Sequence, residues 1–409
     1  MPEAGSPLLL ALNVGSSSLR AKLFVVEETS LRLESTARLD GVGRRHARLR
    51  VDDVGFSVGG VADHARAAEL LLERMLPGSQ AVESRLVAIG HRIVHGGAHL
   101  TAPVRVTADV WRQLDTLREL APLHNPPALT VVRATAARYP RVPLYAVFDT
   151  AFFAELPPHA REYALPAEWR FNRGLRRFGF HGLAHEHLVR EARRHGTPPR
   201  RLVTLQLGNG CSAAAVLDGK PVDTSMGFSP LEGLIMATRP GDLDAGVLLE
   251  LARRGESWSA INHMLHRESG LKGLSGATGD VRELLELEAH GHEGAILAMA
   301  AFHHRLLKYV GAYAALLGGL DAIAIGGGIG ENAPAVRARL CRGLEWLGVR
   351  LDTAANDDAA GLAARITSSS SAIAIDVIPV DEELLIAERV RDALPVAEPA
   401  GGSTARRAW

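Results

Sequence analysis

Three stretches of the chain share one pattern, in which a short run of apolar residues leads into a glycine-containing turn. Residues 8–26 and 201–222 are each predicted to form a buried strand, a tight turn and a second strand. In residues 320–340 the strand 322–325 leads into a glycine-rich loop, after which a helix begins near Ala333. Because the first two stretches stand in different halves of the chain, they indicate two similar α/β domains facing each other across a cleft, with ligand-binding loops at the carboxyl ends of the strands.

Apolar residues at helical spacing predict the structure of the segments between and after these strands. The predicted helices are residues 61–76, 127–139, 185–195, 245–254, 293–317 and a final amphipathic helix at 381–393. A polar stretch at 367–371 is predicted to be a surface loop before a strand at 372–379. The remaining residues, 394–409, have the composition of a disordered tail.

Length and composition limit the class of protein. A chain of 409 residues exceeds what one hydrophobic core usually organises, which favours two domains. A formal net charge of zero gives no long-range attraction to nucleic acid or to an anionic membrane. The two cysteines, Cys211 and Cys341, exclude a disulfide scaffold and a cysteine-rich zinc site, and they fit a reducing, cytoplasmic setting. No apolar run approaches the roughly 20 residues of a membrane span, and residues 8–12 are too short for a signal-peptide core.

The glycine-containing turns are candidates for phosphate or nucleotide binding. Residues 13–18, with the sequence NVGSSS, offer backbone N–H groups and hydroxyls to a phosphate, but serine-rich turns and the turn at 208–210 are common features of hairpins. The segment 326–330 is more specific, because four glycines between a strand and a helix indicate a ligand that approaches the backbone closely. No Gly-Lys-Ser/Thr follows, so this is not a Walker loop, and a nucleotide base or ribose is the favoured ligand.

Charged and titratable residues stand at turns beside the apolar strands. Arg92 lies among glycines in GHRIVHGG, and Arg239 lies in the turn TRPGD, where a guanidinium could hold a carboxylate or a phosphate. His124 stands in a loop bounded by prolines, His181 precedes a glycine, and Asp149 follows an apolar strand. Each of these residues, taken alone, is more often a surface ion pair, a helix cap or a satisfied polar group.

Taken together, these segments resemble the acetate kinase family, which belongs to the superfamily of acetate and sugar kinases, Hsp70 and actin. The resemblance runs in order from about residue 8 to residue 387. It is carried by the blocks NVGSSSLR, GHRIVHGG, APLHNPPAL, VFDTAF, RRFGFHGLAH, LGNGCS, DTSMGFSPLEGLIMATRPGDLD, SGLKGLSGATGD, GGGIGENA and IPVDEEL. The longest of these blocks, residues 223–244, is specific enough to decide the matter.

The resemblance implies an α/β fold of two similar actin-like (ribonuclease H-like) domains that face each other across a nucleotide cleft. The first domain would be residues 1–150, completed by the C-terminal helix 384–393, and the nucleotide-binding second domain would be residues 151–383. It also implies a cytoplasmic homodimer formed through the second domain. Neither nucleic acid nor a membrane is an expected partner.

The implied activity is reversible, direct in-line transfer of the γ-phosphoryl group of ATP to acetate, which gives acetyl phosphate and ADP. The expected cofactor is Mg²⁺, with Mn²⁺ as a substitute, and ATP is a co-substrate. The resemblance implies catalytic roles for Asp149, His181, Arg239 and Arg92, with transition-state support from His124. It implies that the carboxylic acid is bound by Arg92, Val94, Leu123, Phe180 and Pro230.

The other implied residues hold the nucleotide and the metal. The ATP-binding residues would be Arg20, Asn209, Gly210, Asp280, Val281, Arg282, Gly328, Ile329 and Asn332. Ser16 and Ser18 would form the phosphate loop, and Asn13 and Glu382 would serve the metal. This set fits the chemistry, because a carboxylate is a poor nucleophile that must be oriented in line, and arginine assistance to phosphoryl transfer is worth roughly 10³–10⁵ in rate.

Several positions depart from the family pattern. Arg20 stands where the family usually has lysine, Gln206 stands in place of a histidine, and Phe153 also stands in place of a histidine. Leu183 and Ala184 replace a Thr-Ser pair, which removes two hydroxyls beside the histidine at 181 and with them the expected support of that ring.

Four alternatives remain open from the sequence. Propionate or butyrate kinase is the nearest, because one methylene in an apolar pocket is worth only about 1–3 kcal/mol, although Val94 favours the smaller acid. A pyrophosphate-dependent enzyme is disfavoured by the intact adenine-side blocks at 275–282 and 326–332. An actin- or Hsp70-like binding protein would need no acid site. A catalytically inactive ATP-binding regulator would bind nucleotide without turnover.

Overall fold

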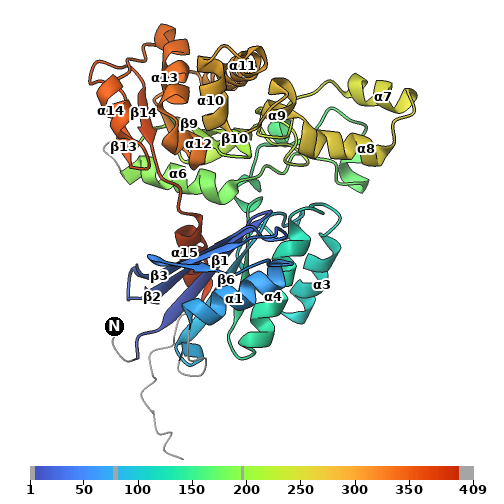
Figure 1. The fold of residues 1–409 in the computed structure, drawn as a ribbon, viewed down its shortest axis with the longest axis vertical. Helices are drawn as coiled ribbons and strands as arrows, with labels where there is room; N and C mark the ends of the chain where they lie inside the picture. Colours follow the sequence, from blue (N-terminus) through green and yellow to red (C-terminus); the bar gives the residue numbers. More distant parts are fainter. Residues whose placement is uncertain (1–4, 77–81, 195–197, 396–409) are drawn as a thin grey trace, which may run out of the picture.

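The computed structural model describes residues 5–76, 82–194 and 198–395, and the predicted tail lies outside these residues from position 396 onward. The described chain is a mixed α/β structure with one eight-stranded and one six-stranded sheet. Figure 1 shows the two sheets in two bodies, one above the other, with the last helix returning to the body that contains the N-terminal strands. None of the helices in these residue ranges is both long and apolar enough to cross a bilayer.

The first sheet has the strand order β5-β4-β3-β2-β1-β6-β8-β7. Its strands are β1 (Leu8–Val14), β2 (Ser18–Val26), β3 (Leu31–Asp40), β4 (Arg48–Val51), β5 (Val54–Ser57), β6 (Leu86–Ile93), β7 (Val104–Arg105) and β8 (Leu144–Phe148). β1 and β2 are antiparallel and joined by a tight turn, which confirms the predicted strand, turn and strand. β1, β6 and β8 are parallel, so their carboxyl ends meet at one edge of the sheet.

Helices cover both faces of the first sheet. On one face, apolar strand residues pack against α1 (His64–Met75), α3 (Ala108–Thr116) and α4 (Asn125–Arg138). On the other face, Leu9, Ala11 and Phe24 pack against α15 (Glu382–Ala393). A Cβ on Gly90 would lie 2.8 Å from a methyl carbon of Ile386 in α15, so β6 needs a glycine where this helix crosses it.

The second sheet has the order β11-β10-β9-β12-β14-β13. Its strands are β9 (Arg201–Leu207), β10 (Cys211–Leu217), β11 (Lys220–Thr224), β12 (Ala322–Gly326), β13 (Ala364–Arg365) and β14 (Ala374–Val377). The antiparallel β9 and β10 confirm the second predicted strand pair. The predicted strand at 372–379 is the shorter β14, because residues 368–371 form a turn and the chain leaves the sheet after Val377.

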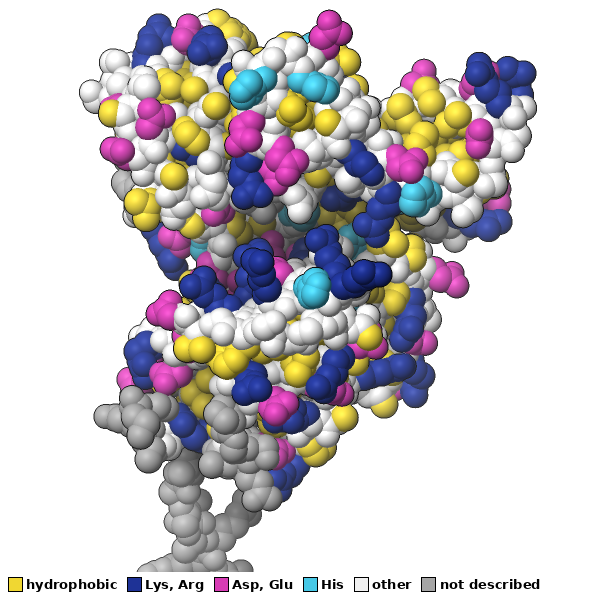
Figure 2. Space-filling model, in the orientation of Figure 1, with side chains coloured by type: hydrophobic (Ala, Val, Ile, Leu, Met, Phe, Trp, Pro, Cys, Tyr) yellow, Lys and Arg dark blue, Asp and Glu magenta, His cyan; other side chains and the backbone are white. Residues whose placement is uncertain are grey.

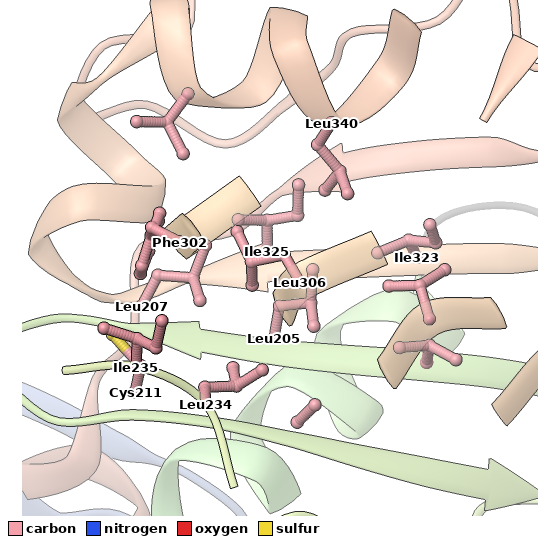
Figure 3. Close-up of a cluster of buried hydrophobic side chains, with 14 of the residues drawn as sticks. Leu205, Leu207, Cys211, Leu234, Ile235, Phe302, Leu306, Ile323, Ile325 and Leu340 are labelled. Carbon is pink, nitrogen blue, oxygen red and sulfur yellow. The ribbon is translucent and has the colours of Figure 1, made fainter. Parts of the chain in front are cut away.

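The core of the second half lies between its sheet and two of its helices. Leu205 and Ile325 of the strands point toward Phe302 and Leu306 of α11 (Glu293–Leu316) and toward Leu340 of α13 (Pro334–Gly343) (Figure 3). The opposite face of the sheet packs against α6 (Gly182–Arg194).

The remaining helices are short and connect these layers. They are η1 (Ala151–Phe153), α5 (Pro158–Arg161), η2 (Glu168–Asn172), α7 (Ala245–Arg253), α8 (Trp258–His263), η3 (Met264–Glu268), α9 (Gly270–Ser275), α10 (Val281–Ala289), α12 (Gly327–Asn332), η4 (Glu345–Leu347) and α14 (Thr353–Asp358). The helices predicted from apolar periodicity are all present, with ends shifted by a few residues. The division of the chain into domains at residues 150 and 383 remains a prediction.

One expectation about the glycine-rich segment is wrong. The glycine-rich residues 326–330 were expected to form a loop, and from Gly327 onward they instead form the helix α12, whereas the helix expected near Ala333 is present as α13. Gly327, with a left-handed φ of 80°, lets the helix begin directly after β12. Gly330 then packs on Ile325, where a Cβ would lie 2.7 Å from a methyl carbon.

Candidate active site

A cavity of about 910 Å³ lies between the two halves of the molecule. Figure 2 shows this face, with Lys, Arg and His side chains gathered along the hollow between the upper and lower bodies. Of the residues predicted from the sequence, the cavity is lined by Asn13, Ser18, Arg20, Arg92, His181, Asn209, Gly210, Asp280, Val281, Arg282, Gly328, Ile329, Asn332 and Glu382. The two sheets thus contribute to one shared cavity.

Arg92 and Asp149 form an ion pair at the carboxyl ends of β6 and β8. Arg92 Nε donates to Oδ1 of Asp149 at 3.0 Å, and Nη2 donates to Oδ2 at 2.5 Å. Asp149 is fully buried, and burial raises the pKa of its carboxyl, an effect that Arg92 opposes. Burial also acts to lower the pKa of the Arg92 guanidinium, but Asp149 and Glu382 more than offset this, so Arg92 keeps its positive charge.

Asn13, at the end of β1, joins this pair to the first turn of α15. Its Oδ1 accepts a hydrogen bond from Arg92 Nη1 at 3.1 Å, and its Nδ2 donates to Glu382 at 2.7 Å and to Glu383 at 2.8 Å. Burial, with the charge of Glu382, raises the pKa of Glu383. Glu383 was missed from the sequence, where its only signal is its place beside Glu382 in IPVDEEL.

The turn between β1 and β2 is closed by a backbone hydrogen bond from Gly15 N–H to the carbonyl of Ser18 at 2.9 Å. A Cβ on Gly15 would lie 2.6 Å from Ser18 Oγ, so the glycine allows this hydroxyl to lie against the backbone. Ser18 lines the cavity, whereas Ser16 is an exposed residue of the same turn and does not line it.

His181 stands immediately before α6 with a left-handed φ of 57°. Burial, together with Arg239 and Arg92, lowers its pKa well below the usual value, so the ring is neutral. Its Nδ1 is 2.9 Å from Ser212 Oγ, and Ser212 was missed from the sequence although it lies in the block LGNGCS. Leu183 and Ala184 are buried without hydroxyls, so the support expected from that pair comes from Ser212 on β10 instead.

The guanidinium of Arg239 lies beside the same histidine. A Cβ on Gly210 would lie 2.5 Å from Arg239 Nη2 and 3.2 Å from His181 Nε2, so both groups flank that glycine. Arg239 Nη1 donates to the carbonyl of Pro230 at 2.5 Å, and no carboxylate in the described chain pairs with this arginine. Burial lowers the pKa of Arg239 to about 10, which leaves it charged at neutral pH.

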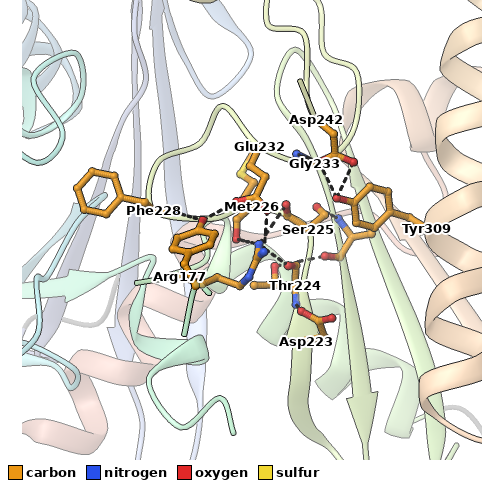
Figure 4. Close-up of polar contacts among 12 residues, drawn as sticks. Arg177, Asp223, Thr224, Ser225, Met226, Phe228, Glu232, Gly233, Asp242 and Tyr309 are labelled. Atoms are coloured by element: carbon orange, nitrogen blue, oxygen red, sulfur yellow. Dashed lines mark hydrogen bonds and ion pairs between the residues drawn. The ribbon is translucent and has the colours of Figure 1, made fainter. Parts of the chain in front are cut away.

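A partly buried polar network contacts the loop that carries Arg239 (Figure 4). Arg177 donates to Glu232 at 2.7 Å and to two backbone carbonyls at 224 and 226. Tyr163 donates to the other oxygen of Glu232 at 2.5 Å. Further along, Asp242 accepts a hydrogen bond from Tyr309 at 2.9 Å. These hydrogen bonds hold the loop on both sides of Arg239.

Of the apolar residues expected to bind the acid, only some lie close to one another in the structure. Val94 and Phe180 are buried in one apolar cluster, whereas Leu123 is 37% exposed. None of Val94, Leu123, Phe180 and Pro230 lines the cavity. His124 stands immediately before α4, and burial, followed by the charges of Arg239 and Arg92, lowers its pKa to about 4.

In the second half of the molecule, residues of the short helices α10 and α12 line the cavity. Asp280 caps α10 by accepting a hydrogen bond from the backbone N–H of Arg282 at 2.9 Å, and the two side chains also pair at 2.6 Å. Asn332 Nδ2 donates to the carbonyl of Gly328 at 3.0 Å. Glu331, another residue missed from the sequence, accepts hydrogen bonds from the N–H groups of residues 327 and 380.

Two further residues that line the cavity, Arg38 and Gln206, concern positions where the sequence departs from the family pattern. Arg38 on β3 pairs directly with Arg20 on β2, and both line the cavity. Nothing in the sequence indicated Arg38. Gln206 lines the cavity as well, and its buried Oε1 has no hydrogen-bond partner in the described residues. Phe153 is buried edge-on against the ring of His185, at 5.7 Å between ring centres.

Comparison with known proteins covers nearly the whole chain. The model of the acetokinase family matches residues 8–388. The chain is 38% identical over 397 residues to an acetate kinase of Bacteroides thetaiotaomicron, covering 94% of this chain and 99% of the relative. It is 41% identical over 409 residues to an acetate kinase of Syntrophobacter fumaroxidans, covering 97% of this chain and 99% of the relative.

Comparison with solved structures agrees with the comparison of sequences. The chain matches an acetate kinase of Porphyromonas gingivalis with a TM-score of 0.83 and 34% identity, over 95% of this chain and 99% of that one. It matches a propionate kinase of Francisella tularensis subsp. tularensis with a TM-score of 0.85 and 34% identity, over 94% of this chain and 98% of that one. The predicted fold class, two actin-like α/β halves facing across a cleft, is confirmed.

Proposed function

The chain belongs to the acetokinase family, and from this we propose that it transfers the γ-phosphoryl group of ATP to acetate, giving acetyl phosphate and ADP. The observation that carries the proposal is the convergence of Arg239 and His181 on Gly210, at the edge of a cavity that also contains Arg92. Arg239 has a charge and no acidic partner among the described residues, as expected of a group that binds an anionic ligand.

We assign different roles in the in-line transfer to Arg239, His181 and Arg92. Transfer places negative charge on the equatorial oxygens of the phosphoryl group, and preorganised donors stabilise this charge most strongly in a buried site. Arg239 and His181 would donate to these oxygens from one side. Arg92, held in place by Asp149, would orient the acid so that one carboxylate oxygen lies in line with the phosphorus.

The nucleotide is proposed to lie along the second half of the cavity. Asp280, Val281 and Arg282 at the start of α10 and Gly328, Ile329 and Asn332 of α12 would surround the adenosine. Asn209 and Gly210 would contact the phosphates, as would Arg20 and Ser18 from the opposite half. These positions support ATP over pyrophosphate as the donor, because the adenosine end of the cavity is built from residues that pyrophosphate would not reach.

The side chains at the start of α15 fit a magnesium ion that arrives with the nucleotide. Mg²⁺ keeps several waters and is usually held by one or two carboxylates and the substrate phosphates. Glu382 offers a carboxylate that lines the cavity, and Asn13 holds that carboxylate through Nδ2 while its own amide oxygen accepts from Arg92. The described residues contain no cluster of three His, Cys, Asp or Glu side chains suited to a metal held by protein alone. When bound, the ion would neutralise charge on the phosphates, and Mn²⁺ would serve the same purpose.

We also propose that the protein acts in the cytoplasm as a homodimer formed through its second half. The region of α7 and α8 projects to one side in Figure 1 and carries exposed apolar side chains, including Leu249 and Trp258. Sedimentation velocity of the full chain tests this, and a monomer at micromolar concentration contradicts it.

Trapping of the product tests the proposed reaction. The protein is incubated with Mg-ATP and acetate, propionate or butyrate, and hydroxylamine converts any acyl phosphate to a hydroxamate. We expect acetyl hydroxamate as the main product, and its loss in Arg92→Ala and Arg239→Ala. No product from any acid, with folded protein that binds ATP, overturns the enzyme proposal and favours an inactive regulator.

A propionate kinase is the second candidate, favoured by the structural likeness to the propionate kinase described above. The same trapping experiment separates the two. Propionyl hydroxamate as the main product keeps the mechanism and changes the substrate.

A further inference from the structure

A chain of four polar side chains runs back from the cavity into the second half of the molecule. His181 Nδ1 lies 2.9 Å from Ser212 Oγ, which lies 2.7 Å from Nε2 of His185. His185 Nδ1 in turn lies 2.7 Å from Thr204 Oγ1. The last three residues, on β10, α6 and β9, have no exposed surface, so water cannot replace any of these hydrogen bonds.

The number of protons in this chain restricts how it is arranged. A hydroxyl has one proton, so Ser212 donates to one of the two rings and accepts from the other. In the first arrangement, His181 donates from Nδ1 to Ser212, Ser212 donates to His185, and His185 donates to Thr204. In the second arrangement every direction is reversed, and Thr204 donates to His185.

The buried end of the chain selects between the two arrangements. In the first, Thr204 accepts from His185, and its own hydroxyl proton has no acceptor, since Oγ1 has no other hydrogen-bond partner in the described residues. A buried donor without an acceptor is unfavourable. In the second, Thr204 donates its proton, and every proton in the interior part of the chain takes part in a hydrogen bond. The second arrangement is therefore the stable one.

The second arrangement leaves the proton of His181 on Nε2, the nitrogen that faces the cavity. This nitrogen would lie 3.2 Å from a Cβ on Gly210, and Arg239 Nη2 would lie 2.5 Å from the same point. The ring and the guanidinium therefore present N–H donors to one small region. An oxygen of the transferring phosphoryl group that lies over Gly210, at van der Waals distance from its Cα, would accept from both.

We propose that Ser212, held by His185 and Thr204, is a positioning residue that fixes the neutral His181 ring with its proton on Nε2, so that the ring donates to the transferring phosphoryl group. The donation from His181 to a phosphoryl group rests on the proposed kinase activity. The assignment of the proton to Nε2 does not depend on that activity, because it follows from the buried hydrogen bonds alone.

Nitrogen NMR of the full chain with ¹⁵N-labelled histidine tests the proton assignment without any catalysis. The His181 resonances are identified as those lost in His181→Asn. We expect a proton-bearing Nε2 and a bare, acceptor-type Nδ1. A proton on Nδ1 overturns the proposal, whether or not the protein is a kinase.

Kinetics test the positioning role. We expect Ser212→Ala to lower kcat roughly tenfold to a hundredfold while the KM values for ATP and acetate change less than about twofold, since the His181 ring, which loses its fixed orientation and proton position, donates in the transition state. Thr204→Val should lower kcat less, and Thr204→Ser should restore it. An unchanged kcat in Ser212→Ala and Thr204→Val overturns the role.

A matched control exists in the other half of the molecule. Thr135 Oγ1 lies 3.1 Å from Nε2 of the buried His91, and neither residue lines the cavity. Thr135→Val likewise removes a buried threonine–histidine contact, although Thr135 also donates to a backbone carbonyl of its own helix, and the variant should leave kcat unchanged. An equal fall of kcat in both variants would show a general effect of losing a buried threonine, and would overturn the proposal.

Discussion

Arg92 donates two hydrogen bonds to Asp149, one from Nε and one from Nη2, and each carboxylate oxygen accepts one of them. The carboxylate is fully buried. They come from β6 and β8, two neighbouring parallel strands, so the ion pair also fixes the ends of these strands relative to each other. Asn13 on β1 accepts a hydrogen bond from the same guanidinium. Three adjacent strands therefore end in one hydrogen-bonded group at the floor of the cavity.

The losses of stability caused by removing Arg92 and Asp149 one at a time should add up to more than the loss caused by removing both. Asp149→Ala leaves Arg92 with only the more distant Glu382, at 3.9 Å, as an acidic partner, and we expect a loss of about 3–5 kcal/mol in the free energy of unfolding. The double variant Arg92→Ala/Asp149→Ala should lose less than the sum of the two single variants. Urea denaturation of the four proteins measures this, and additive losses contradict the expected coupling.

Lowered histidine pKa values make stability depend on pH. Burial lowers the pKa of His91 and of His185 to about 3, and burial lowers the pKa of His95 and of His124 to about 4. These rings bind protons in the unfolded chain below its histidine pKa of about 6.5 but stay neutral in the folded protein, so stability should fall from pH 6.5 toward pH 4.

Urea midpoints at pH 7 and pH 5 check this dependence. His91→Asn, which removes one of the buried rings, should make the difference between the two midpoints smaller. Equal midpoints at both pH values in the parent protein would show that these rings do not remain neutral when folded.

The paired arginines on β2 and β3 should contribute to ATP binding. Arg38 lies directly opposite Arg20 and forms an ion pair with Asp40 at 2.6 Å, and both arginines line the cavity, where an anion bound between them would offset their repulsion. Arg38→Gln should raise the KM for ATP about three- to tenfold, less so at high salt, with little change in kcat. Arg50→Gln is the control, because Arg50 pairs with Arg38 from β4 but does not line the cavity. The same rise of KM in both variants contradicts a specific role of Arg38.

A methyl group on Gly210 should block the site without unfolding the protein. The Cβ of Gly210→Ala would lie 2.5 Å from Arg239 Nη2 and 3.1 Å from a ring carbon of His181, so both side chains would have to move. We expect kcat to fall at least about a hundredfold, since each is proposed to donate to the phosphoryl group. Steady-state kinetics and thermal unfolding measure the two effects separately.

Gly311→Ala is the matched control for this variant. Gly311 lies in α11 with no atom within 4 Å of the added Cβ, so activity should be unchanged and stability should rise by about 0.5–1 kcal/mol. Wild-type kcat in Gly210→Ala would show that the proposed position of the phosphoryl group is wrong.

Local patterns were sufficient to predict much of the fold. The strand pairs β1–β2 and β9–β10 follow from apolar runs separated by short turns, since the hydrogen bonds of a hairpin are made by neighbours in sequence. The helix α12 was not predicted, because glycine-rich sequence has low helix propensity. Packing of Gly330 against β12 overrides that preference, and packing cannot be read from the local sequence.

The same distinction applies to the candidate site. Residues within recognisable blocks, such as Arg92, His181 and Asn209, were predicted and line the cavity. Ser212 and Arg38 were not predicted, because each is significant only through a residue far from it in the chain. Ser212 meets a histidine from α6, and Arg38 meets an arginine across a strand pair. Such relationships depend on tertiary structure and strand register.

The return of α15 to the first sheet has a consequence for synthesis of the protein. Leu9, Ala11 and Phe24 are covered by this helix, which is made after the whole second half of the chain. While the ribosome translates residues 149–381, one face of the earliest strands therefore lacks its native cover. The nascent N-terminal half should need a chaperone or a temporary partner for that face, and should complete its core only when α15 has left the exit tunnel.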